Sequence, residues 1–141
     1  MSIMGFSIEK VTSIVDAHFP QAREDVGAFV IEELPKLGAR VRLPFQDRFI
    51  RPGGSVSGPT MFKLADIAVY IAILGERGED ALQAVTSNMT INFLSRPEPA
   101  DLVCDVQLLR MGRRLVVAEA GLISVGKEGL VGHATCTYAM P

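Results

Sequence analysis

The segment from Pro59 to Leu74 constrains the fold more than any other part of this chain of 141 residues. Its apolar residues occupy every side of a helical wheel, and its only charged side chains are Lys63 and Asp66. A helix that is apolar all round is normally buried by the rest of its domain. Pro59 suits the first helical position because its missing N–H costs nothing there, and Gly75 is expected to end the helix. The chain must therefore surround one long helix.

Strand-like runs make up most of the remaining sequence. Two runs flank the turn Pro35–Gly38 and predict a β-hairpin before the long helix, over residues 27–34 and 39–45. Four more runs, separated by turn-like breaks, follow the helix at residues 82–94, 101–111, 113–125 and 130–140. We expect these four to form a meander. An antiparallel sheet that wraps one long helix is an α+β architecture, here with about five or six strands.

Ahead of the hairpin, apolar residues recur at helical spacing over residues 7–19, where Ser7 is the expected N-cap and Pro20 stops the helix. We treat residues 1–20 as a helix appended to a single domain that covers residues 1–141. His18, at the end of this helix, is not counted among the site residues.

Composition excludes several classes of function. The net charge of −2 gives no sign of nucleic-acid binding. Cys104 and Cys136 lie in strand-like runs and are interpreted as small core residues in a reducing compartment. His133 has no second ligand at metal-binding spacing, so no metal site is expected. The N-terminus lacks a signal-peptide pattern and the apolar helix is too short and too charged to span a bilayer, which predicts a cytoplasmic protein.

Asp66 is the unusual residue, because it is a carboxylate inside an apolar helix. A carboxylate in such a place can act as a general base or as a nucleophile. Two structural interpretations stand beside this one: Asp66 pairs with Lys63, three residues earlier, or it faces solvent. Gly58, at the start of the helix, offers a free backbone N–H at the positive end of the helix dipole, where an oxyanion would be stabilised.

Three segments resemble the PaaI-like acyl-CoA thioesterases of the hotdog superfamily: GGSVSGPTMFKLADIAVY, AVTSNMTINFLSRPEPADL and LLRMGRRLVVAEAGLIS. The resemblance implies a hotdog fold and hydrolysis of an acyl-CoA thioester, with no cofactor beyond the coenzyme A of the substrate. It places Asp66 at the family's catalytic acid and Gly58 at the glycine whose N–H polarises the thioester carbonyl. Ser57 replaces the histidine of many members. Thr86 takes the place of a catalytic serine or threonine.

Substrate-binding residues are expected around this centre. Period-two alternation puts Val85, Met89, Ile91 and Phe93 on one face of a strand, and Thr86, Asn88, Thr90 and Asn92 on the other. The acyl group is expected to contact apolar helix residues, and the coenzyme A phosphates to contact arginines on a turn unless that turn is a solvated hairpin tip. The substrate-binding candidates are Ser57, Phe62, Val69, Tyr70, Asn88, Arg110, Arg113 and Arg114.

Association of two or four chains is expected for two reasons. The second face of the sheet is predicted to carry large apolar residues, namely Leu109, Val116 and Leu122, which a partner would cover. Hotdog relatives also place the helix acid of one subunit opposite the strand serine or threonine of the other, which implies that Thr86 comes from the neighbouring chain. A non-catalytic acyl-CoA-binding hotdog protein remains the alternative. A hotdog dehydratase ranks last, because no histidine lies near Asp66 in the sequence.

Overall fold

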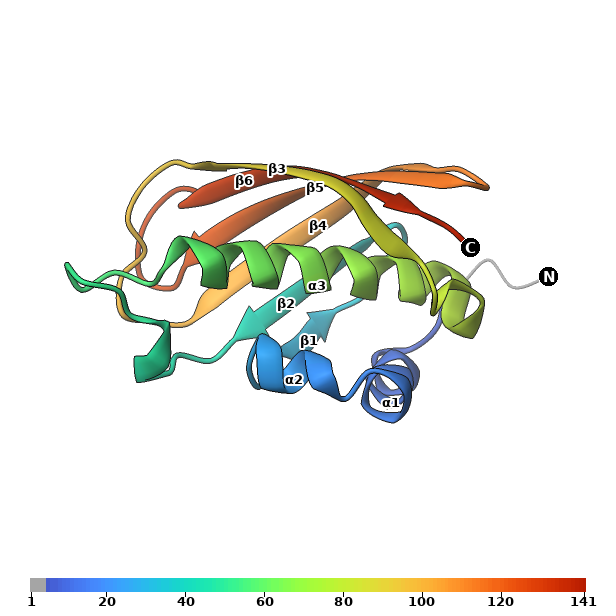
Figure 1. Cartoon of the computed structure of the whole chain (residues 1–141), viewed down its shortest axis with the longest axis horizontal. Helices are drawn as coiled ribbons and strands as arrows, with labels where there is room; N and C mark the ends of the chain where they lie inside the picture. Colours follow the sequence, from blue (N-terminus) through green and yellow to red (C-terminus); the bar gives the residue numbers. More distant parts are fainter. Residues whose placement is uncertain (1–4) are drawn as a thin grey trace.

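One antiparallel sheet of six strands curves around one long helix (Figure 1). The structure is a computed structural model that describes residues 5–141, so the first four residues of the expected segment 1–20 lie outside it. The strands follow the order β1-β2-β4-β5-β6-β3. Their bounds are Val30–Glu33 (β1), Gly38–Leu43 (β2), Val85–Phe93 (β3), Leu102–Met111 (β4), Leu115–Ser124 (β5) and Gly132–Ala139 (β6). The helices are Ile8–His18 (α1), Gln21–Asp25 (α2) and Gly58–Arg77 (α3), with 3-10 turns at Asp47–Phe49 (η1) and Gly78–Ala81 (η2). The expected α+β hotdog architecture is confirmed.

Helix α3 begins and ends with different capping devices. At its start, the Ser57 hydroxyl accepts the Thr60 N–H at 3.3 Å and caps the first turn. The predicted end at Gly75 is wrong, because α3 continues to Arg77. Gly75 is instead a packing residue, since a Cβ there would lie 3.0 Å from the Leu34 side chain. Gly78, with φ of 58°, turns the chain out of the helix.

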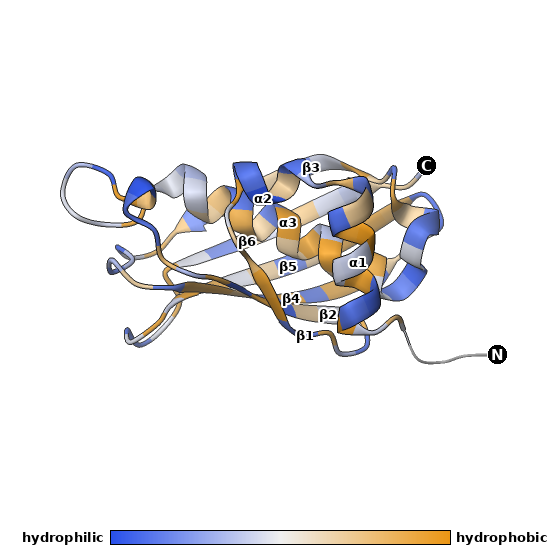
Figure 2. Ribbon diagram, turned by 90° about the horizontal axis from the view of Figure 1, so that it is seen from below, coloured by the Kyte–Doolittle hydropathy of each residue, from blue (hydrophilic) through white to orange (hydrophobic). Residues whose placement is uncertain are grey.

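The burial of α3 is as the sequence predicts. The structure buries 12 of its 20 residues, and Figure 2 shows the apolar residues concentrated where α3 meets the sheet. The expectation that this helix is too short and too charged to span a bilayer is wrong, because the segment Gly58–Ala81 is long and apolar enough to cross one; 67% of its most apolar window is nevertheless buried inside the fold. Free thiols of Cys104 and Cys136 are part of the same interior, as expected, and burial raises the pKa of Cys136 to about 12.

The two N-terminal helices cover part of α3. The Ser7 hydroxyl accepts the Lys10 N–H at 3.1 Å, which confirms the predicted N-cap of α1. Buried residues Val11, Ile14 and Val15 attach α1 to the core. The short helix α2 follows at once, and both helices lie on the opposite flank of α3 from β3 (Figure 1).

Strand β3 does not continue into the strand that follows it in sequence. Strands β4, β5 and β6 form a meander, but β3 pairs with β6 and forms one edge of the sheet. The expected four-strand meander is therefore wrong for β3. As an edge strand it is little covered: Val85, Phe93 and the adjacent Leu94 are 59%, 55% and 56% exposed.

Two of the three large apolar residues expected on the second face of the sheet lie on its inner face, which corrects that expectation. Val116 and Leu122 are both fully buried beneath the sheet, because alternation along β5 points them at α3. Only Leu109 is exposed, at 55%, where the register of β4 against β5 shifts. Ion pairs cross the outer face instead, and join Arg40 to Asp105, and Arg42 to Glu32 and Asp101.

Candidate functional site

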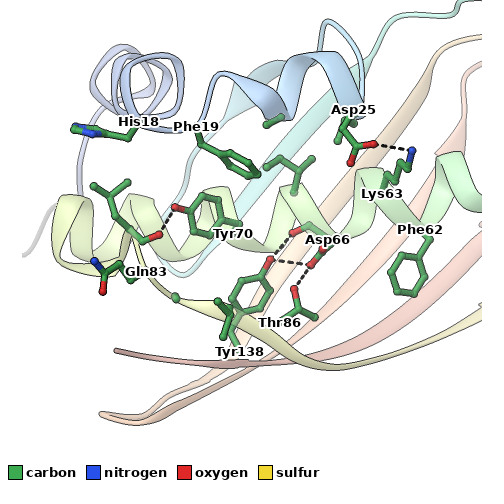
Figure 3. A pocket seen from close by; sticks show the side chains of 16 residues that line it. His18, Phe19, Asp25, Phe62, Lys63, Asp66, Tyr70, Gln83, Thr86 and Tyr138 are labelled. Carbon is green, nitrogen blue, oxygen red and sulfur yellow. Dashed lines mark hydrogen bonds and ion pairs between the residues drawn. The ribbon is translucent and has the colours of Figure 1, made fainter.

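Asp66 lies in the middle of α3 between two buried neighbours, and is itself half-buried. It does not pair with Lys63, whose ammonium group lies 2.8 Å from a carboxylate oxygen of Asp25 on α2. It does not simply face solvent either, because it accepts hydrogen bonds from two hydroxyl groups (Figure 3). Both structural interpretations of Asp66 are therefore wrong.

Two hydroxyl groups hold one carboxylate oxygen of Asp66. The Thr86 hydroxyl donates to Oδ1 at 2.6 Å, and the Tyr138 hydroxyl donates to the same atom at 2.7 Å. The Tyr138 hydroxyl also lies 3.1 Å from the backbone carbonyl oxygen of Asp66. No described residue donates to Oδ2. This leaves Oδ2 as the oxygen that is free to take a proton from water or to attack an electrophile.

A β-bulge explains how Thr86 reaches Asp66. Along β3, Thr86 pairs with Tyr138 and Asn88 pairs with the preceding Thr137, so Ser87 is an extra residue without a partner. Residues that pair across strands share one face of the sheet, so Thr86 lies on the inner face beside Tyr138. The prediction that Thr86 shares the face of Asn88 is wrong, as is the prediction that Val85 shares the face of Met89.

Thr86 and Asp66 belong to the same chain, which corrects a second expectation. The neighbouring subunit is not needed to supply Thr86, because the hydrogen bond between the two residues forms within one protomer. The connection from α3 through η2 into β3 is short enough to bring residue 86 back alongside residue 66.

Tyr138 is the residue that sequence reasoning missed. It is 4% exposed, and burial together with the Asp66 carboxylate raises the pKa of its hydroxyl, so the hydroxyl remains a donor. Tyr70 stacks on it, with ring centroids 6.2 Å apart, and donates its own hydroxyl to the Leu82 carbonyl at 2.7 Å. The chain has only two tyrosines, and both lie here. A tyrosine at an inward position of a strand needs a partner for its hydroxyl, and that signal was available.

The Asp66 carboxylate, held by the Thr86 and Tyr138 hydroxyls, lines a pocket of about 780 Å³. Figure 3 shows the pocket between α3, the α1–α2 segment and the start of β3. The appended N-terminal helices thus form one wall. The volume of the pocket lies in the range of small-molecule binding sites. The lining residues are His18, Phe19, Ala22, Asp25, Val26, Phe62, Lys63, Asp66, Ile67, Tyr70, Leu82, Gln83, Ala84, Val85, Thr86 and Tyr138.

The pocket contains only some of the predicted substrate-binding residues. Phe62 and Tyr70 line it together with Asp66 and Thr86. Val69 does not, because it is 1% exposed and packs in the core. Asn88 does not line it either, because the bulge leaves its side chain on the outer face of β3.

Ser57 and Gly58 lie at the N-terminal end of α3, away from the pocket. Gly58 precedes Asp66 by eight residues, which is about 12 Å along the helix axis at about 1.5 Å per residue. The Gly58 N–H has no acceptor among the described residues. A Cβ at Gly58 would lie 3.3 Å from the Phe93 ring, so the glycine permits a close contact with β3. The Ser57 hydroxyl is engaged in capping α3.

The three predicted arginines, Arg110, Arg113 and Arg114, lie around the β4–β5 turn and are exposed. None of them lines the pocket or forms an ion pair with a described residue. Their turn is fixed to the C-terminal end of α3 by Arg77, which donates to the Gly112 carbonyl at 3.1 Å. Leu115, just after the turn, and Val85, at the start of β3, both pair with Ala139 of β6. The turn therefore lies at the end of the sheet where β3 meets the pocket.

Comparisons with known structures give relatives of the same architecture. A crystal structure from Silicibacter sp. TM1040, provisionally named a thioesterase, is 40% identical and superposes with a TM-score of 0.87, covering 98% of this chain and 94% of that one. The E. coli PaaI protein from the phenylacetic acid degradation operon superposes with a TM-score of 0.76 and covers 95% of both chains. At 19% identity, that second likeness shows a shared fold.

Sequence comparisons give the family. A Saccharolobus solfataricus protein provisionally named an esterase is 31% identical over 86 residues. That match covers 61% of this chain and 60% of its relative, so the chain spans about three fifths of the relative's length. Residues 53–131 match the Thioesterase superfamily, over a region that contains Gly58, Asp66 and Thr86. Because this match covers more than half of the chain and agrees with the fold and with the resemblance in the sequence, the chain belongs to the hotdog Thioesterase superfamily.

Proposed function

We propose that the protein hydrolyses acyl-CoA thioesters to a carboxylic acid and free coenzyme A. The observation that carries the proposal is the Asp66 carboxylate, held by two hydroxyls through Oδ1 in the wall of an apolar pocket. Family membership makes the thioester the expected electrophile. The pocket does not fix the acyl group, because its apolar and aromatic lining suits more than one apolar acyl chain.

Asp66 has two possible roles in this reaction. As a general base, its Oδ2 takes a proton from water while the water oxygen bonds to the thioester carbon, and the C–S bond then breaks to release the thiolate. As a nucleophile, Oδ2 attacks that carbon, the thiolate leaves, and water hydrolyses the acyl-aspartate anhydride. Both routes pass through a tetrahedral oxyanion that needs a hydrogen-bond donor.

We infer that the Gly58 N–H is this donor and that it comes from a second copy of the chain. Within one protomer Gly58 and Asp66 are about 12 Å apart along α3, and an aspartate side chain is too short to close that gap around one carbonyl group. A two-fold dimer would bring the N-terminus of one α3 toward Asp66 of the other. Gly58 is therefore the residue that we expect across the interface, in place of Thr86.

The edge strand β3 supports a dimer or a dimer of dimers. It has an unpaired backbone edge, and two of its large apolar side chains, Val85 and Phe93, are more than half exposed, which is the type of edge that a second strand covers. Leu94→Glu should give a monomer by light scattering and should lose thioesterase activity with it. Leu109→Glu changes an equally exposed leucine on the outer face and is the control. A fully active monomer would show that one chain holds a complete site.

The central experiment compares wild type, Asp66→Asn and Asp80→Asn for release of free thiol from acyl-CoA. Asp80 is an exposed aspartate in η2, outside the pocket. Asp66→Asn should lower kcat by about 10²–10⁴-fold, the usual contribution of a general base. Wild-type turnover in Asp66→Asn would contradict this mechanism.

One observation favours a second function, non-catalytic acyl-CoA binding. Ser57 stands where many relatives have a histidine, and its hydroxyl is already engaged as the N-cap of α3. A wild-type protein that binds acyl-CoA by calorimetry but releases no thiol over a panel of acyl chain lengths would establish that alternative.

A further inference from the structure

Tyr138 differs from an ordinary buried tyrosine in its choice of partner. A buried phenol needs one acceptor, and a backbone carbonyl is sufficient, as Tyr70 shows by donating to Leu82. Tyr138 instead donates to the Asp66 carboxylate at 2.7 Å, with the backbone oxygen of the same residue 3.1 Å away. Its hydroxyl is therefore directed at the one residue to which the proposed chemistry assigns the central role.

The surroundings of Tyr138 hold this hydroxyl in place. Its ring is 4% exposed and stacks on Tyr70, which in turn meets Phe19 edge-on with centroids 6.1 Å apart. The cross-strand pair with Thr86 puts a second hydroxyl beside it at the same level of the sheet. Two donors on neighbouring strands thus converge on one carboxylate oxygen.

Two donors on a single oxygen restrict the carboxylate more than one donor would. Rotation about the Cβ–Cγ bond of Asp66 would exchange Oδ1 for Oδ2 and would break both hydrogen bonds together. Charge-assisted hydrogen bonds of this length are among the stronger ones in proteins. The two hydrogen bonds therefore fix the orientation of the carboxylate and keep Oδ2 available at the pocket.

We propose that Tyr138 is a positioning residue of the hydrolysis, which pins Oδ1 of Asp66 jointly with Thr86 and so presents Oδ2 to the substrate. This inference rests on the proposed thioesterase function. Tyr138 does not touch the thioester in this role and acts only through Asp66. Its removal should therefore affect the chemical step and leave substrate binding largely intact.

The first test is Tyr138→Phe, which deletes one oxygen atom and keeps the ring. We expect kcat to fall by about 10- to 100-fold with KM changed by less than about twofold, as for an interaction that matters in the transition state. In the Asp66→Asn background the same change should cause no further loss, because the group it positions is already gone. Circular dichroism and Tm show whether each variant is folded.

The outcomes separate this inference from the proposed function. If Asp66→Asn is inactive and Tyr138→Phe keeps wild-type kcat, the positioning role is wrong and the thioesterase proposal stands. Equal losses of kcat from Tyr138→Phe in the wild-type and Asp66→Asn backgrounds would also overturn the positioning role. They would indicate that the hydroxyl affects local packing and does not act through Asp66. An active Asp66→Asn enzyme would remove the proposed function itself.

A second variant covers the case in which Tyr138→Phe does not fold. A difluorotyrosine incorporated at position 138 keeps the ring and hydroxyl, but fluorine lowers the pKa of the phenol. When it ionises it stops donating, so kcat should fall on the alkaline side at a pH where the wild type remains active. The titratable groups that face this hydroxyl are Asp66 and Tyr70 on α3 and Cys136 on β6. An alkaline profile identical to that of the wild type, over a pH range in which the phenolate absorbance shows that the variant ionises, would refute the positioning role.

Discussion

Replacing Thr86 by valine tests the second of the two hydrogen bonds that hold Asp66 Oδ1. The change keeps the branched shape of the side chain and the β-strand preference, but removes the hydroxyl that donates to Asp66 Oδ1 at 2.6 Å. We expect Thr86→Val to fold normally and to hydrolyse acyl-CoA more slowly, because the carboxylate loses one of its two donors.

The size of the effect follows from the bond and its surroundings. A hydrogen bond to a charged group contributes about 1.5–3 kcal/mol. Thr86 is exposed and the Tyr138 donor remains, so the lower value applies. About 1.5 kcal/mol corresponds to roughly a tenfold lower kcat. Stability should change by less than about 0.5 kcal/mol, as for other exposed sites.

The assay is the initial rate of thiol release over a range of acyl-CoA concentrations. Thr90→Val is the matched control, because Thr90 lies on the same strand, pairs with Thr135 and is exposed on the outer face. Equal kcat values for Thr86→Val and Thr90→Val would refute the role of the hydroxyl. A loss above about 10³-fold would show that Thr86 acts on the substrate directly.

Three further predictions follow from the same geometry. Mixing Asp66→Asn chains with Thr86→Ala chains, with exchange proven by native mass spectrometry, should give no more activity than the two variants show separately, because each site takes both residues from one chain; a gain of about a quarter of wild-type activity in a random dimer mixture would contradict this. Arg113→Gln combined with Arg114→Gln should raise KM for coenzyme A esters and leave short thioesters unaffected, whereas equal losses for both would indicate a structural role. Deletion of Ser87 should remove the bulge and leave Thr86 paired with Tyr138 on the inner face, because Thr86 then directly precedes the outward Asn88, so kcat should fall less than in Thr86→Val, measured on folded protein; a loss as large as that of Thr86→Val would mean that the bulge itself is needed for the hydrogen bond to Asp66.

The central helix and its carboxylate were predictable because both are encoded along one continuous segment. An apolar segment between Pro59 and Leu74 can form only a buried helix, and a charge within it stands out in the sequence. The end of the helix was not predictable, since two glycines lie close together. Packing of Leu34 decides that Gly75 stays helical, and the positive φ of Gly78 decides where the helix stops.

Simple alternation was used to predict which face of the sheet each side chain of β3 occupies, and the prediction failed at the extra residue Ser87. A bulge at Ser87 changes the face of everything before it, and no residue type in the local sequence marks the extra residue. The same limitation misplaced Val116 and Leu122, because their inward direction depends on which side of the sheet carries α3.

The sequence alone determined that one apolar helix is wrapped by an antiparallel sheet and that Asp66 is the exceptional residue on it. These properties depend on periodicity and composition, which are local. Tertiary structure alone decided what surrounds Asp66, because Thr86 and Tyr138 are 20 and 72 residues away along the chain. Their meeting requires the pairing of β3 with β6 at the sheet edge and the register set by the bulge at Ser87. Such long-range pairing is settled by how all six strands pack on the helix together, and no single segment contains that information.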